Sequence, residues 1–165
     1  MAYDVKARKR KLITENINRN PKAEAARRQV AAFFLITVLT RLALTAYKII
    51  YLSASGIVMG KAADILLFLG CAVVLYMVTD GNRGLAWVTA ISAVVWGIYC
   101  FTTLSPLLAD KPGAVAFVAI FITVMAVQFI LSVIMATLPM YDTYFSQMMK
   151  INLTIRGEMI SGGKK

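Results

Sequence analysis

The sequence contains no histidine, and only two cysteines and eight acidic residues occur among its 165 residues. Without histidine, the chain lacks the commonest general base and the commonest transition-metal ligand. Cys71 and Cys100 both lie in apolar runs and lack the CxxC spacing of redox and zinc sites, so we interpret them as buried, inert thiols. No Gly-rich phosphate-binding loop occurs. These absences argue against an enzyme, and we expect no cofactor and no metal site.

The chain does contain four long apolar runs. Hydrophobic residues make up 59% of the sequence and the mean hydropathy is +0.71, more than is typical of a soluble domain. The runs cover about residues 29–51, 57–79, 85–109 and 114–138, and each exceeds the ~20 residues that a helix needs to cross a bilayer. Because the connections are short, consecutive helices must run antiparallel. We therefore predict an all-α integral membrane protein, with residues 29–140 forming a four-transmembrane-helix antiparallel bundle.

A basic segment, residues 1–28, precedes the first run and holds nine of the eighteen lysines and arginines. Positive charge gathered beside an apolar run is typical of membrane proteins, so we expect no nucleic-acid partner. Two interpretations stay open: a weak basic helix on anionic headgroups, or a disordered topogenic tail. At its end, Asn20 and Pro21 predict the N-cap and the first residue of a helix.

Residues 141–165 follow the last run and have the pattern of an amphipathic helix. Aromatic residues, methionines and one amide recur there at helical spacing: Tyr144, Phe145, Met148, Met149 and Asn152. Such a face suits the inner membrane interface, and we favour that interpretation. A groove on a partner protein is the alternative, since Met-rich faces adapt to varied surfaces.

The distribution of basic residues also predicts an orientation. The N-terminal segment, the turn containing Arg83 and the C-terminal segment carry most of the lysines and arginines, whereas the opposite side has only Lys61 and Lys111. The positive-inside rule then places both termini in the cytoplasm. We expect the protein in a plasma membrane, of the bacterial type, with anionic inner-leaflet headgroups as lipid partners.

Polar residues inside the apolar runs are the candidate functional residues, because they are costly to place in a membrane. In the first run, four of them share one helical face: Thr37, Arg41, Thr45 and Lys48. We expect that face to point into the bundle. In the third run, Ser92, Trp96, Tyr99 and Thr103 form a partly polar stripe, and the fourth run contains Gln128.

The second run contains one carboxylate, Asp64, which follows Gly56 and Gly60 at steps of four. Two glycines at this spacing predict a close helix–helix contact. Side chains tilt toward the N-terminus of their own helix, so Lys48 and Asp64 on antiparallel helices lean toward each other. We predict an ion pair between them, with Lys61 as the competing partner of Asp64.

Together these residues predict a cleft containing Thr37, Arg41, Asp64, Tyr99 and Gln128. The alternative is that they are scattered hydrogen-bonding groups that hold the helices together. We expect a non-catalytic polytopic membrane protein, a scaffold or accessory subunit in a homo- or hetero-oligomer with other membrane proteins. The alternative function is an oligomeric transporter or channel for a small anionic solute or lipid, because Arg41 would favour an anion.

Overall fold

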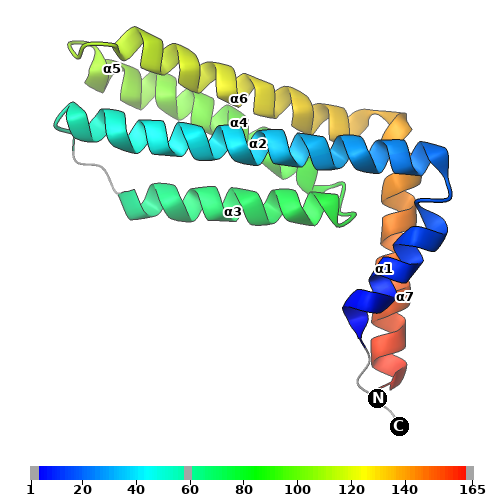
Figure 1. Cartoon of the computed structure of the whole chain (residues 1–165). Coiled ribbons are helices and arrows are strands. Elements are labelled where there is room, and N and C mark those ends of the chain that lie inside the picture. Colours follow the sequence, from blue (N-terminus) through cyan, green and yellow to red (C-terminus); the bar gives the residue numbers. More distant parts are fainter. Residues whose placement is uncertain (1–3, 58–60, 163–165) are drawn as a thin grey trace.

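The computed structural model describes residues 4–57 and 61–162, and all its regular elements over that range are helical. Figure 1 shows the long helices lying side by side, with α1 and α7 across one end. In chain order the elements are α1 (Val5–Asn16), α2 (Pro21–Ala54), α3 (Lys61–Thr79), α4 (Leu85–Tyr99), the π-helical turn η1 (Cys100–Leu104), α5 (Ser105–Leu108), α6 (Ala114–Thr137), the 3-10 turn η2 (Pro139–Tyr141) and α7 (Asp142–Gly162).

Four stretches of the described chain are long and apolar enough to cross a membrane: Pro21–Ala54, Ala62–Thr79, Leu85–Leu108 and Ala114–Thr137. The prediction of an all-helical chain with four membrane-length helices is therefore confirmed. The outer surfaces of these helices carry many exposed large apolar side chains, including Leu66, Ile91 and Val115. Apolar surface of this extent is compatible with a membrane location, because soluble proteins rarely expose it.

The helix α2 begins where the sequence predicts. The Asn20 side chain accepts hydrogen bonds from the backbone N–H groups of Lys22 (3.1 Å) and Ala23 (3.4 Å), and Pro21 is the first helical residue. With 34 residues at ~1.5 Å each, α2 is roughly 50 Å long, more than the ~30 Å of a hydrocarbon core. Its first turns pack against α7 and η2. The predicted start of the first membrane span, near residue 29, lies within this helix.

The third apolar run is interrupted near its end. The Ser105 N–H donates to the Cys100 carbonyl, five residues back, which makes a single π-helical turn between α4 and α5. Pro106 has no N–H, and its ring crowds the preceding turn of a regular helix. A π turn is one way for a helix to absorb such a residue.

Small side chains set the closest contact among the long helices, between α4 and α6. Ala86, Ala90 and Ala93 on α4 are all buried, and small residues at these spacings let two backbones approach. The Thr89 hydroxyl donates to Ser132 Oγ across this contact at 2.8 Å. The helix α3 packs least: 11% of its most apolar window is buried, against 22–28% for the other three.

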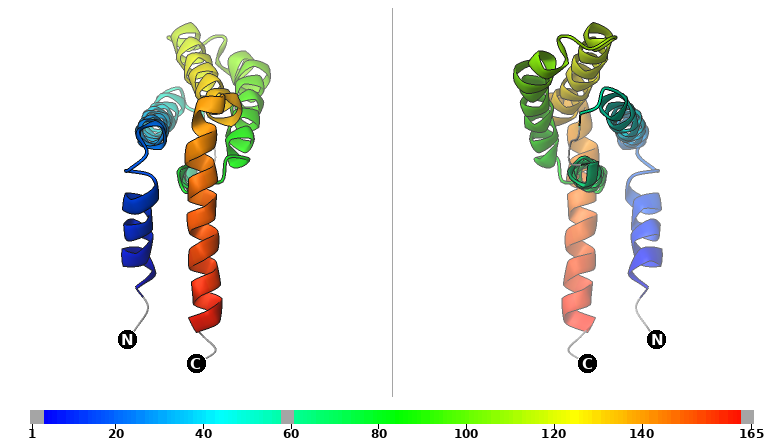
Figure 2. Two further views of the ribbon diagram at one scale, coloured as in Figure 1. Left: turned by 90° about the vertical axis from the view of Figure 1, so that its right-hand side faces the viewer. Right: turned by 90° about the vertical axis from the view of Figure 1, so that its left-hand side faces the viewer.

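The helices α1 and α7 form a layer across one end of the four long helices (Figures 1 and 2). On α7, Tyr144, Met148 and Ile151 are buried in one apolar cluster with Ile17 and the first turns of α2. The sequence suggested that this face meets the membrane interface or a partner protein. Most of it is covered instead by the chain itself, while the neighbouring Met149 is exposed.

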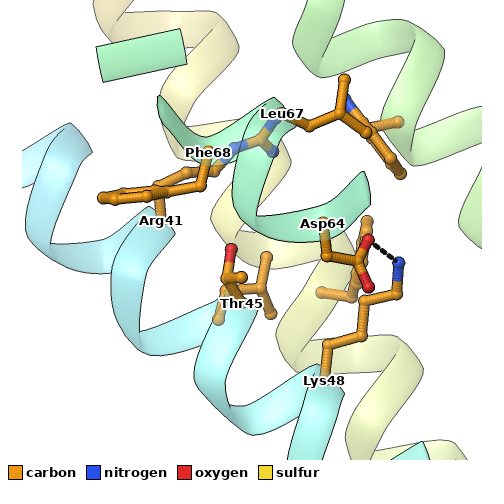
Figure 3. Close-up of a pocket in the computed structure, with 9 residues that line it drawn as sticks. Arg41, Thr45, Lys48, Asp64, Leu67 and Phe68 are labelled. Carbon is orange, nitrogen blue, oxygen red and sulfur yellow. Dashed lines mark hydrogen bonds and ion pairs between the residues drawn. The ribbon is translucent and has the colours of Figure 1, made fainter. Parts of the chain in front are cut away.

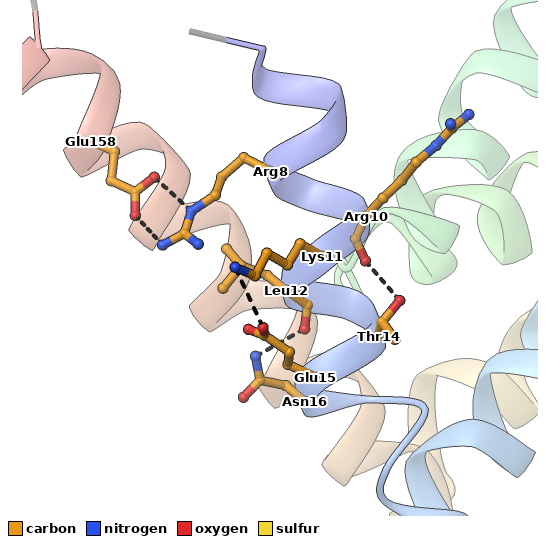
Figure 4. A network of polar contacts seen from close by, with 8 residues as sticks. All are labelled: Arg8, Arg10, Lys11, Leu12, Thr14, Glu15, Asn16 and Glu158. Carbon is orange, nitrogen blue, oxygen red and sulfur yellow. Dashed lines mark hydrogen bonds and ion pairs between the residues drawn. The ribbon is translucent and has the colours of Figure 1, made fainter.

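Ion pairs hold α1 in place, as Figure 4 shows for one of them. Arg8 makes a bidentate pair with Glu158 of α7, with Nε–Oε2 and Nη2–Oε1 distances of 3.1 and 2.8 Å. Lys9 pairs with Asp80 in the α3–α4 turn. Within the basic segment, α1 is therefore a helix packed on α7, an arrangement that neither interpretation from the sequence included, whereas the segment's residues from Pro21 onward belong to α2.

The α3–α4 turn packs directly on α7. Gly81 has φ +107°, and a Cβ there would lie 2.8 Å from Met148 Cβ, so only glycine fits. The Tyr144 hydroxyl donates to the Thr79 carbonyl at 2.5 Å. Burial raises the pKa of Tyr144 to about 12; Arg27 opposes this shift and Asp80 adds to it.

Candidate functional site

A polar layer lies between two apolar clusters of the long helices. One cluster gathers α1, α7 and the adjoining helix ends, and the other gathers the opposite halves of α2, α4 and α6. The buried polar residues between them are Thr37 and Arg41 on α2, Thr89 on α4, and Gln128 and Ser132 on α6. Three helices therefore contribute polar groups at one level, and this level is where we place the candidate site.

The expected ion pair between Lys48 and Asp64 is present. Lys48 Nζ lies 2.6 Å from Asp64 Oδ1, and the two side chains are only 6% and 13% exposed. The ammonium group also lies over the rings of Trp96 and Tyr99, 5.3 and 5.6 Å from their centroids. Aromatic faces stabilise a cation, most strongly when water is excluded. The competing partner, Lys61, has a side chain outside the described residues.

Arg41 is a second buried cation, and it has no matching carboxylate. It is 7% exposed, and no acidic side chain of the described residues pairs with it. Its Nη1 donates to Met125 Sδ at 2.7 Å, and its guanidinium lies 5.7 Å from the Trp96 ring centroid. A thioether is a weak acceptor, so most of the five guanidinium N–H donors lack a strong partner. The described site thus holds two cations and one carboxylate.

These charges line a cleft between α3 and α4. One hollow, of about 370 Å³, is lined by Lys48, Asp64 and Tyr99 together with Leu67 and Trp96. A second, of about 210 Å³, shares Leu67 and Trp96 but is lined by Arg41 and by Cys71 and Ser92. We call the two together the α3–α4 cleft.

A small hollow of about 30 Å³, lined by Arg41, Thr45, Lys48 and Asp64, lies beside this cleft. Figure 3 shows Lys48 of α2 reaching Asp64 on α3, whereas the Arg41 side chain extends toward Leu67. The hollow is large enough for one or two water molecules. The polar stripe predicted along α2 therefore points at its neighbouring helices, as expected.

Gln128 and Thr37 lie at the edge of this arrangement. Gln128 Nε2 is 3.4 Å from the Thr89 carbonyl and 3.8 Å from Cys71 Sγ, and its Oε1 is buried with no hydrogen-bond partner among the described residues. Thr37 is buried one turn before Arg41 and does not line the hollows described above. Of the five residues predicted to share a cleft, Arg41, Asp64 and Tyr99 do so.

Of the two glycines predicted to pack a helix interface, Gly56 does not do so. Gly56 lies after the end of α2 with φ +73°, outside α3, and no atom lies within 4 Å of where its Cβ would be. Its role is to reverse the chain, a backbone conformation that glycine adopts freely. Gly60 lies outside the described residues.

Two residues of the site were not predicted from the sequence. Met125 and Cys71 look like ordinary core residues, and only their approach to Arg41 and Gln128 gives them a place here. Trp96 belongs to the predicted stripe on the third run, but its position between both cations depends on how α4 is rotated.

The arrangement suits binding of an anionic group better than catalysis or metal binding. No group of three or more His, Cys, Asp or Glu residues comes together in residues 4–57 and 61–162. What the cleft offers is an unneutralised guanidinium, two aromatic rings and an apolar wall. Comparisons with protein-family models, with curated proteins and with solved structures found no match, so the site has to be interpreted from its own geometry.

Proposed function

We propose that this protein is a non-catalytic subunit of a membrane assembly, in which Arg41 pairs with an acidic side chain of a neighbouring transmembrane chain. The chain would cross the membrane four times as an antiparallel bundle, with both termini in the cytoplasm of a bacterial cell. The observation that carries the proposal is that Arg41 is buried among apolar helices while Asp64 is already taken by Lys48.

The cost of an unpaired cation supports this proposal. A charge at the centre of a bilayer costs at least ~2.5–3.5 kcal/mol, and such residues usually face a partner or a water-filled cavity. Arg41 lines the hollow between α3 and α4, and α3 is the least covered of the four long helices. An acidic side chain on a helix lying over α3 and α4 could enter the cleft and form a bidentate pair.

The test compares the effect of one substitution on the stability of the isolated chain with its effect on binding of the partner chain. Replacing Arg41 by methionine removes a buried charge, so Arg41→Met should stabilise the isolated chain in detergent by about 1–3 kcal/mol. The same substitution should abolish co-purification of the partner from membranes solubilised in mild detergent. Arg41→Lys should retain part of it, and Lys111→Gln, which removes an exposed cation from the α5–α6 turn, should change neither property.

The outcomes separate a binding role from a purely structural one. If Arg41→Met destabilises the isolated chain and leaves the purified complex unchanged, Arg41 only fastens helices and the proposal fails. A wild-type chain that purifies alone as a monomer, with no partner lost in the variant, also contradicts it.

The two hollows favour a second candidate, an oligomeric transporter or channel for a small anion. Wild-type chain reconstituted into vesicles would then conduct anions, and Arg41→Ala would abolish this flux. An absence of flux from a correctly inserted wild-type chain would exclude this candidate and leave the assembly proposal standing.

A further inference from the structure

A larger hollow lies away from the α3–α4 cleft, at the corner between α7 and the α3–α4 turn. It has a volume of about 930 Å³ and is walled by the end of α3, by the turn and by one face of α7. As Figure 1 shows, α7 runs across the direction of the four long helices at the end where α3 meets α4. We call this hollow the α7 corner.

One wall of the α7 corner is apolar and exposed. Met77 belongs to the last turn of α3, and Met149 and Leu153 lie one turn apart on α7, 61% and 58% exposed. Ile160 continues this stripe along α7. The opposite side of α7 is already buried against α1 and α2, so this stripe is a second apolar face of the same helix.

The other wall carries a cation, Arg156, that no described residue neutralises. Both carboxylates of the corner are occupied: Asp80 pairs with Lys9, and Asp142 pairs with Arg83. Arg83 also makes two backbone hydrogen bonds, since its Nε and Nη2 donate to the carbonyls of Met135 (3.2 Å) and Leu138 (2.9 Å).

Arg156 makes no ion pair or hydrogen bond with any described residue, although it lines the same hollow. The side chains of Ser146 and Asn82 also line it, and both are exposed. The corner therefore combines a free guanidinium and two small polar groups with an apolar wall. Those features match the phosphate and the upper acyl chains of one phospholipid.

We propose that the α7 corner binds the headgroup of an anionic phospholipid from the leaflet on the side of the two termini. Arg156 holds the phosphate, Ser146 and Asn82 provide further hydrogen bonds, and the acyl chains leave along Met77, Met149 and Leu153. The proposal rests on the membrane placement proposed above but not on the role of Arg41. At the end of α3, the corner lies at the level where such a chain meets the headgroups.

The test is a lipid titration of the full-length chain in mild detergent, followed by native mass spectrometry. Phosphatidylglycerol should bind more tightly than phosphatidylcholine. Arg156→Gln should weaken phosphatidylglycerol binding about fivefold and phosphatidylcholine binding by less, because the choline ammonium already offsets the phosphate charge of that lipid. The matched control is Lys150→Gln, which removes a cation from a different side of α7, beside Leu12 and Asn16, and should have no effect. Leu153→Asn should weaken binding of both lipids, because it acts on the acyl chains.

Three results would overturn the proposal. They are equal binding of the two lipids to the wild type, equal effects of Arg156→Gln and Lys150→Gln, and equally tight binding of glycerophosphoglycerol, which has the phosphate but no acyl chains. Membrane placement is tested separately, by alkaline carbonate extraction of cell membranes. A chain released by carbonate contradicts the placement, whereas a chain retained there that fails the titration contradicts only this lipid site.

Discussion

The Lys48–Asp64 ion pair gives the most quantitative prediction. Its charged atoms are 2.6 Å apart and both side chains are almost buried. At that separation and an effective dielectric constant of about 20, the Coulomb attraction is about 6 kcal/mol before any desolvation cost. Removing one partner leaves the other charge buried alone, so Asp64→Asn and Lys48→Met should each lower the free energy of unfolding by ~3–5 kcal/mol.

The double variant separates this electrostatic effect from simple loss of packing. With both charges removed, the free energy of unfolding should return to within ~1 kcal/mol of the wild type, because two neutral side chains pack without a desolvation cost. The coupling energy of the cycle should then be about 5 kcal/mol or more. Equilibrium unfolding in mixed micelles can be followed by tryptophan fluorescence, since Trp96 lies over the Lys48 ammonium.

The control cycle uses Lys11 and Glu15, an exposed i,i+4 pair on α1 with its charged atoms 4.0 Å apart. Its coupling should stay below ~0.5 kcal/mol. If the Asp64 and Lys48 substitutions simply add, or couple no more strongly than this control, then the buried pair does not fasten α2 to α3 and the electrostatic argument is wrong.

Three further predictions concern single positions. Gly81→Ala should lower the free energy of unfolding by about 1–3 kcal/mol, because Gly81 has a positive φ and its new Cβ would clash with Met148. Gly70→Ala should raise the free energy of unfolding by ~0.5–1 kcal/mol, because Gly70 lies in the helix α3 with open space around it. Thermal unfolding of both variants measures this difference. Tyr144 has a pKa raised from 10.0 to about 12, so its contribution to stability is complete below pH 10 and is lost as the pH rises toward 12. Between pH 10 and pH 12 the free energy of unfolding of the wild type should therefore fall by about 2–3 kcal/mol more than that of Tyr144→Phe. If this free energy changes by the same amount in both proteins between pH 9 and pH 12, the pKa shift is wrong. Ser132→Ala removes the buried hydroxyl that is hydrogen-bonded to Thr89 and should cost ~0.6–1.7 kcal/mol in detergent unfolding; no change would mean that Thr89 gives its single hydroxyl hydrogen to the Ala86 carbonyl and gains nothing from Ser132.

Local features of the helices followed from the sequence. The cap at Asn20 needs only one side chain and the two N–H groups that follow it, so its geometry is encoded within four residues. The Lys48–Asp64 pair could be predicted because the two residues lie near one tight connection between consecutive helices. Helix periodicity decides which residues of the two helices face each other, and side-chain tilt makes the Lys48 and Asp64 side chains lean toward one another.

Features that depend on contacts with a third or fourth helix could not be predicted from the sequence. The position of Gly56 was misjudged because step-of-four spacing was extended back from Asp64 to a residue that lies outside α3. The Met-rich face of α7 was expected at a membrane or a partner protein, since the sequence does not indicate that α1 folds back to cover it. The contact of Arg41 with Met125 joins residues 84 positions apart, so no local pattern in the sequence predicts it.

The sequence by itself determined four apolar helices of membrane length, the start of the first of them, and a buried ion pair between the first two. Only the tertiary structure decided that Arg41 contacts Met125, that a cleft opens between α3 and α4, and that α7 bends across the end of α6 to form a corner with an arginine that no described residue pairs with. The physical reason is that a helix that is apolar on every side has no preferred face. Its rotation, and so its contacts with distant residues, is then decided by packing among all the helices.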